Sequence, residues 1–251
     1  PKLAQTLFNY TPPADKYDVR HNLQGYSNSE VKQLALEANW NLGHGLVTAV
    51  TGWRDVTFDS STDFDGSPIT LFHFKDNQES QDQKSLELRY ASSFSDTYRF
   101  TTGVYWFDQS FFVGERRETF GGIVGGVPTI TNTAGVVNQD QNNVAVFAEG
   151  SVDFTPQWTL TLGGRYTKEK KEIVFSPPGR CALDFSSCTL ALPGERDWSN
   201  FSPKVGVNWK AAEDVLAYAS WTRGFRSGVF NQRAQRVEFL GPSEPEVVDS
   251  Y

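Results

Sequence analysis

The clearest hydrophobic pattern in this sequence runs from Asn143 to Glu172, where apolar and polar residues alternate with the period of a β-strand. The alternation is interrupted at Thr155-Pro156-Gln157 and then resumes, so the segment predicts a hairpin. Each arm keeps its pattern for about ten residues, the length of a tilted strand that crosses a bilayer. On the second arm, Trp158 and Tyr166 share a face about 20 Å apart in height, close to the ~25 Å apolar band of an outer-membrane barrel.

Seven further segments carry strand patterns, which makes eight clear strands and the start of a ninth. They lie at 29–42, 46–58, 85–91, 98–111, 204–210 and 215–223, with the last beginning at Val247 and reaching Tyr251. For the strands near 46–58, 98–111 and 215–223, the pattern does not assign which residues point to which side. In the first of these, Val50 and Trp53 fall on opposite parities.

The predicted connections alternate between short and long. Short turns are expected near 44, 94, 156 and 212. Long loops are expected at 59–83, 114–141, 176–196 and 224–245, the second of them mobile, and residues 1–28 are also read as a loop. Short turns at one edge and long loops at the other are typical of an outer-membrane barrel. We therefore expect an all-β, antiparallel up-and-down meander that forms part of a transmembrane β-barrel.

Aromatic residues gather beside each short turn, as a girdle at the periplasmic interface would. They are Trp40, Tyr90, Phe94, Tyr98, Phe154, Trp158, Trp209 and Tyr218. A soluble meander has no reason to place Trp and Tyr at one height in every hairpin. A soluble or surface β-meander adhesion module nevertheless remains an alternative.

The cost of placing charge in lipid assigns the faces of the strands. An Arg or Lys at the bilayer midplane costs about 2–4 kcal/mol, and acidic residues cost somewhat less. Charged residues on the polar parity of their strands are therefore expected to face the lumen. They are Glu87, Arg89, Glu149, Arg165 and Lys204.

Composition narrows the class of protein. No segment of the 251 residues approaches the ~18 consecutive apolar residues of a transmembrane helix. The net charge of −7 argues against a nucleic-acid-binding protein. Cys181 and Cys188 lie close together in a Pro/Gly-rich segment, so either a local disulfide, which suggests an oxidising compartment, or two free thiols would fit.

Motifs for enzymatic chemistry are missing from the sequence. It contains no phosphate-binding loop, no HExxH, no CxxC and no GxSxG, and we expect neither an enzyme nor a bound cofactor. The Asp63-Phe64-Asp65-Gly66 segment is a weak match to a calcium loop, because the first ligand position would be Ser61 and the twelfth Phe72. We therefore expect no metal site.

Several segments resemble the barrel of TonB-dependent outer-membrane receptors. They are Ser85 to Tyr90, Val144 to Glu149, Leu162 to Thr167, Phe201 to Gly206, Tyr218 to Asn231 and Pro245 to Tyr251. One departure is Val229, where these receptors more often have a second glycine. The resemblance implies a ~22-stranded barrel in the outer membrane of a Gram-negative bacterium, plugged by an N-terminal domain. Residues 1–251 would be an internal part of that barrel, without the plug and without the C-terminal strands.

The resemblance also implies partners and a function. The partners would be outer-membrane lipid, the missing plug domain, the TonB complex and a scarce ligand such as a ferric siderophore, cobalamin or an oligosaccharide. A passive porin is the alternative. Ligand contacts are expected in the long loops. The candidates are Phe72, Phe74, Phe111, Phe112, Arg116, Arg117 and Phe120.

Overall fold

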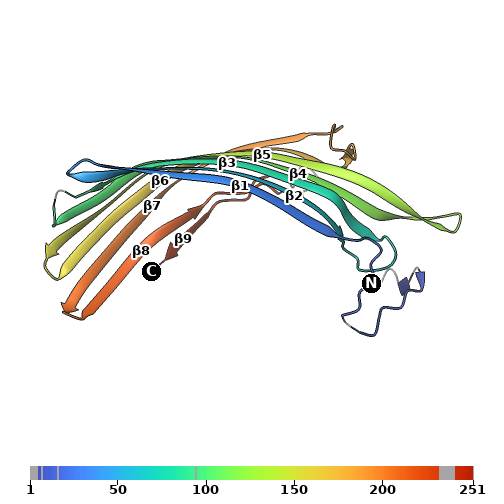
Figure 1. Cartoon of the computed structure of the whole chain (residues 1–251), viewed down its shortest axis with the longest axis horizontal. Helices are drawn as coiled ribbons and strands as arrows, with labels where there is room; N and C mark the ends of the chain where they lie inside the picture. The colour runs from blue at the N-terminus through green and yellow to red at the C-terminus, as the bar shows by residue number, and fades with distance from the viewer. Residues whose placement is uncertain (1–4, 7, 16, 94, 232–240, 251) are drawn as a thin grey trace.

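The described residues, 5–6, 8–15, 17–93, 95–231 and 241–250 of a computed structural model, form one antiparallel sheet in which each strand pairs with the next along the chain (Figure 1). Its nine strands are β1 (Tyr26–Asn41), β2 (Gly45–Asp63), β3 (Phe72–Ser92), β4 (Tyr98–Val124), β5 (Val127–Thr155), β6 (Trp158–Cys181), β7 (Leu192–Ala212), β8 (Val215–Arg226) and β9 (Glu246–Ser250). Among these residues, no helix is long and apolar enough to span a membrane.

The meander and its alternating connections confirm the predicted fold class. Four short turns join β1 to β2, β3 to β4, β5 to β6 and β7 to β8, and Figure 1 shows all four at the left end of the sheet. The remaining connections lie toward the other end. Phe94 in the second turn and Tyr251 after β9 lie outside the described residues.

The expected long loops were wrong in extent, because the strands continue into each of them. β2 and β3 leave only residues 64–71 between them, and β6 and β7 leave 182–191. β8 reaches Arg226 and β1 begins at Tyr26. The physical reason is that hydrogen bonds between paired backbones hold a strand in place whatever its side chains are. Apolar and polar residues alternate strongly only where one face of the strand contacts an apolar environment.

The segment 114–141, expected to be a mobile loop, is the far half of the β4–β5 hairpin. Its residues pair from Gly114–Val136 to Val124–Val127, with one irregularity between Phe120 and Gly122. The turn consists of Gly125 and Gly126, with φ of 59° and 81°. Positive φ at both central residues is what a two-residue hairpin turn requires, and glycine adopts it without strain.

Cross-strand pairing divides the sheet into an apolar face and a polar face. One row of directly opposed residues is apolar throughout and consists of Ala49, Leu88, Val104, Val146, Tyr166 and Phe201. The adjacent row points to the other side and consists of Val50, Glu87, Tyr105, Ala145, Thr167 and Asn200. The register also settles the open strand near 46–58, because Trp53 lies on the apolar face and Val50 on the polar face.

The apolar face is a band of limited height. On β6 it extends from Trp158 to Tyr166, and the next residues on that side are Lys168 and Lys170. On β4 it ends at Trp106, which is followed on the same side by Asp108. Hydrogen bonds to Glu172 and then Glu195 raise the pKa of the Lys170 ammonium, so the upper edge of the band is charged.

Most aromatic residues beside the short turns share the apolar face. Trp158 stacks on Trp209 with ring centroids 5.4 Å apart and on Phe154 at 6.3 Å. Trp40, Tyr90 and Tyr98 lie on the same side by register. Tyr218 was wrongly grouped with them: it pairs with Asn208 and lies on the polar face. Sequence proximity to a turn does not determine which way a side chain points.

If lipid covers the apolar face, Val104→Arg should lower the free energy of unfolding, by up to the ~2–4 kcal/mol that an arginine costs at the bilayer midplane. Thr101→Arg is the matched control, because Thr101 lies on the same strand but pairs with Glu149 on the polar face. Urea titration of the complete gene product in lipid vesicles measures both. Equal losses for the two variants would contradict the assignment of the faces.

Candidate functional site

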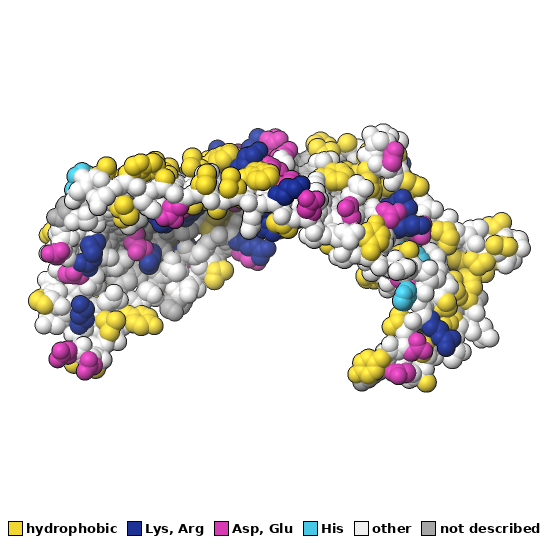
Figure 2. All heavy atoms as spheres, in the orientation of Figure 1, with side chains coloured by type: hydrophobic (Ala, Val, Ile, Leu, Met, Phe, Trp, Pro, Cys, Tyr) yellow, Lys and Arg dark blue, Asp and Glu magenta, His cyan; other side chains and the backbone are white. Residues whose placement is uncertain are grey.

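The five charged residues predicted to face a lumen line one cavity on the polar face, with a volume of about 450 Å³. Glu87 and Arg89 come from β3, and Glu149, Arg165 and Lys204 come from β5, β6 and β7. Figure 2 shows the hollowed side of the sheet with acidic and basic side chains on the wall of its left half. Register explains why residues so far apart in sequence meet, since Glu149 pairs with Gly163 and Gly163 with Lys204.

Ion pairs and aromatic contacts position the charges of this cavity. Lys204 Nζ lies 2.7 Å from Glu149 Oε2, and Arg89 Nη1 lies 3.2 Å from Glu87 Oε1. The Arg165 guanidinium lies over the rings of Tyr105 and Phe147, 5.2 and 5.9 Å from their centroids. Since the ion pairs are partly exposed, they contribute little to stability. Three cations against two carboxylates leave the five with a net positive charge.

Farther from the short turns, the segment Ser227–Phe230 folds onto the polar face. Lys171 Nζ donates to Ser227 Oγ and to the Gly228 carbonyl, both at 2.9 Å, and lies 3.1 Å from Glu169 Oε1. Ser227 also donates to Glu169. Lys171 and Glu169 are each only 7% exposed, so this is a buried ion pair whose charges are satisfied by several hydrogen bonds.

An apolar cluster next to this ion pair completes the attachment of the segment. It consists of Val137, Ile173, Phe175, Leu192, Trp198 and Phe230. Phe230 packs edge to face on Trp198 with centroids 6.4 Å apart, and Lys171 Nζ lies 5.6 Å from the centroid of the same Trp198 ring. Sequence reasoning missed this cluster because 224–245 was read as a loop. The available signal was Ile173 and Phe175, two apolar residues on the otherwise polar parity of β6.

The seven candidate ligand-contact residues lie on strands rather than in loops, and they divide between the two sides of the sheet. Phe72, Phe74, Phe111 and Arg117 lie on the side of the charged cavity. Arg117 lies over the Phe74 ring, 5.8 Å from its centroid. The other three, Phe112, Arg116 and Phe120, point to the opposite side. There Phe112 contacts Phe185, Arg116 pairs with Asp76, and Phe120 contacts Phe8.

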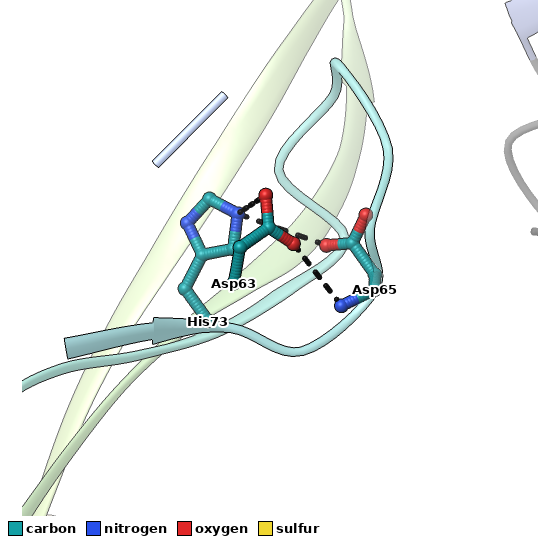
Figure 3. A group of neighbouring side chains, drawn as sticks. All are labelled: Asp63, Asp65 and His73. Atoms are coloured by element: carbon teal, nitrogen blue, oxygen red, sulfur yellow. Dashed lines mark hydrogen bonds and ion pairs between the residues drawn. The ribbon is translucent and has the colours of Figure 1, made fainter. Parts of the chain in front are cut away.

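Two further features lie near the long connections. Cys181 and Cys188 form a disulfide with an S–S distance of 2.09 Å, which closes a short loop between β6 and β7. Asp63, Asp65 and His73 gather at the β2–β3 connection, where their potential ligand atoms all lie within 4.8 Å of one another (Figure 3). These three residues could hold a metal ion, although the sequence led us to expect none.

Comparison with known proteins gives a consistent result. A family model described as TonB dependent receptor-like, beta-barrel matches residues 2–251. The ferric yersiniabactin uptake receptor FyuA from Yersinia pestis superposes with a TM-score of 0.66 at 11% identity over 90% of this chain and 32% of its own. The ferric-catecholate import receptor Fiu from E. coli K12, in its closed form, gives 0.66 at 14% over 96% and 40%. No curated protein matches the sequence.

Replacing Lys171 by methionine should lower the free energy of unfolding by about 3–5 kcal/mol, because it leaves the Glu169 carboxylate buried without its partner. Lys170→Met is the matched control. Lys170 is the adjacent lysine and its ion pairs with Glu172 and Glu195 are exposed, so the expected loss is much smaller.

Urea titration of the complete gene product measures the two variants. The double variant Glu169→Gln/Lys171→Met should recover most of the loss, since it leaves no unpaired charge. Equal stability of Lys171→Met and Lys170→Met would show that the Glu169–Lys171 pair does not anchor Ser227–Phe230.

Proposed function

Since the chain belongs to the TonB-dependent receptor β-barrel family, we propose that it forms part of an outer-membrane receptor that imports a scarce ligand with energy from TonB. The two-faced sheet supports this function most strongly. An apolar band edged by aromatic rings suits contact with lipid, and a charged cavity on the other face suits a polar lumen. The strands that carry both faces are joined by short turns at one end, as in such barrels.

The chain spans 32% and 40% of the length of the two receptors it superposes on. The proposed whole protein therefore has further strands and a plug domain that occupies the lumen and contacts TonB. The edges of the sheet are consistent with further strands, because β1 and β9 stand at the two ends of the strand order and each pairs with one described strand. A long unpaired edge is an aggregation liability unless another strand covers it.

The proposed ligand is an anionic iron chelate of the ferric-siderophore class. FyuA and Fiu are named as receptors for ferric yersiniabactin and ferric catecholates, respectively. Within this chain, the net positive charge of the five cavity residues would favour an anion. The Arg117 guanidinium, which is paired with Glu115, and the Phe74 ring beneath it would favour aromatic or apolar groups. Both features lie on the same side of the sheet.

Transport is tested in a strain that lacks its own siderophore receptors and expresses the complete gene product. Radiolabelled ferric siderophores, cobalamin and an oligosaccharide are supplied in parallel, with and without functional TonB. The expected result is uptake of one ferric siderophore that disappears without TonB. Uptake that is independent of TonB and unselective would identify a passive porin instead.

Ligand contact is tested by a pair of adjacent phenylalanines on opposite sides of the sheet. Phe111→Ala and Arg117→Ala should each weaken binding of the transported siderophore by about 5-fold or more, the effect of removing an energetically important contact. Phe112→Ala should leave the affinity unchanged, because Phe112 faces Phe185 on the other side. Equal effects of Phe111→Ala and Phe112→Ala on equilibrium binding would argue against this ligand-facing side.

A further inference from the structure

Three adjacent strands bring an imidazole and two carboxylates into one row at the β2–β3 connection. Asp63 on β2 lies directly opposite His73 on β3, and His73 lies directly opposite Glu118 on β4. The pairing register shifts at two places between the short turns and this row. One shift lies between Ser60 and Thr62 on β2, and the other lies between Phe74 and Gln78 on β3. Bulges of this kind redirect side chains. Asp65 then joins the group from the connection itself (Figure 3).

The polar atoms of this group are buried but lie too far apart for hydrogen bonds. His73 is 2% exposed, and the side chains of Asp63 and Asp65 are 6% and 8% exposed. His73 Nε2 lies 3.6 Å from Asp63 Oδ2 and 3.7 Å from Asp65 Oδ2. His73 Nδ1 has no hydrogen-bond partner among the described residues. Asp63 Oδ2 accepts from the backbone amide of Asn22 at 3.2 Å, so within this group the atom without a partner is His73 Nδ1. A buried polar atom is seldom left in this state.

The two carboxylates are held in place by backbone amides. Asp63 Oδ1 accepts from the amides of Asp65 and Gly66, at 3.2 and 2.8 Å. Asp65 Oδ2 accepts from the amides of Leu71 and Phe72, at 3.0 and 2.9 Å. Both side chains are therefore positioned before any ligand arrives, and both direct an oxygen toward His73 Nε2.

Glu118 faces the other side of the imidazole. Its Oε2 lies 3.6 Å from His73 Nδ1, and its Oε1 accepts from Lys75 Nζ at 2.9 Å. A histidine that binds a metal through one nitrogen usually directs its other N–H at a carboxylate, which fixes the orientation of the ring. Glu118 occupies the position of such a carboxylate.

Asn22 contributes a fourth polar group from the segment before β1. One terminal atom of its amide lies 3.0 Å from His73 Nε2 and 3.3 Å from both Asp63 Oδ2 and the Ser67 carbonyl oxygen. All three neighbours are acceptors when Nε2 is unprotonated. An amide nitrogen at this position donates to all three, whereas an amide oxygen there needs a proton on Nε2 or a cation between it and these atoms. The hydrogen bonds favour the nitrogen at this position in the metal-free site, and rotation of the amide would bring the oxygen there when a cation binds.

We propose that Asp63, Asp65 and His73, with the Asn22 amide oxygen, bind one divalent transition-metal ion, for which Zn²⁺ is the probe. Zinc binds imidazole nitrogen and carboxylate oxygen at about 2.0–2.2 Å, so two ligand atoms at a tetrahedral angle lie about 3.4 Å apart. The observed separations of 3.6 and 3.7 Å are close to this value. Calcium is disfavoured because it takes about 6–8 oxygen ligands and no imidazole.

The bound ion would connect three parts of the chain that are far apart in sequence. Asn22 lies before β1, Asp63 ends β2, Asp65 lies in the connection, and His73 lies at the start of β3. The ion would hold the connection against the segment that precedes the sheet. This site does not depend on the proposed transport function, since it involves neither the charged cavity nor the candidate ligand-contact residues Phe111 and Arg117.

The test is isothermal titration of Zn²⁺ into the complete gene product, purified in detergent and treated with a chelator. The wild type should bind one more tight equivalent of Zn²⁺ than His73→Gln does. Glu118→Gln should weaken that site about 10–100-fold, the usual effect of removing a carboxylate that orients a ligand histidine. His44→Gln is the matched control and should match the wild type, because His44 contacts Tyr90 at a short turn.

Heat-modifiable gel migration reports whether each variant has folded. If His73→Gln fails to fold, Asp63→Asn decides the question, because it keeps the oxygen that accepts from the Asp65 and Gly66 amides and removes the charge. Loss of the tight equivalent in that variant supports the site. Equal zinc stoichiometry and affinity in the wild type and in a folded His73 or Asp63 variant overturn it, and so does binding of Ca²⁺ but not Zn²⁺ by the wild type.

Discussion

The structure depends on one constraint, which is that successive side chains of a strand point to opposite sides while the pairing register carries each choice to the neighbouring strand. A single row makes this visible. Leu88, Val104, Val146 and Tyr166 oppose one another on four strands, so one apolar position on β3 commits three others to the same side. A slip of one residue in any pair would move charged side chains such as Arg165 onto the apolar face.

The sequence predicted the strands best where the two sides of a strand face different environments, one apolar and one polar. The hairpin around Pro156 has the expected strands, and Glu149, Arg165 and Lys204 meet as a polar parity predicts. Beyond Tyr166 the prediction weakened. Lys168, Lys170 and Glu172 continue β6 without an apolar face, and their strand is stabilised by pairing with β5 and β7, which no local pattern reports. The long loops were overestimated for this reason.

Other features could not be predicted because they arise only from pairing between distant segments. Asp63, His73 and Glu118 form one row only after two changes of register, and the Asp63-Phe64-Asp65-Gly66 segment alone resembles a poor calcium loop. Likewise, Ser227–Phe230 covers Lys171 across 56 residues of sequence, measured from Lys171 to Ser227. The parity of Ile173 and Phe175 indicated a covered surface there, but not the segment that covers it.

The central claim is that the apolar face meets lipid and the polar face lines a lumen that is shielded from lipid. The most direct test is a spin-label scan of residues 158–170 on β6 in the complete gene product, reconstituted in lipid vesicles. Collisions with oxygen and with a water-soluble nickel chelate should alternate with a period of two, with oxygen favoured at Trp158, Leu160, Leu162 and Tyr166. The alternation should give way to general access by the nickel chelate at Lys168 and Lys170. Equal access to both reagents along 158–166 would contradict the assignment of the faces and the barrel built on it.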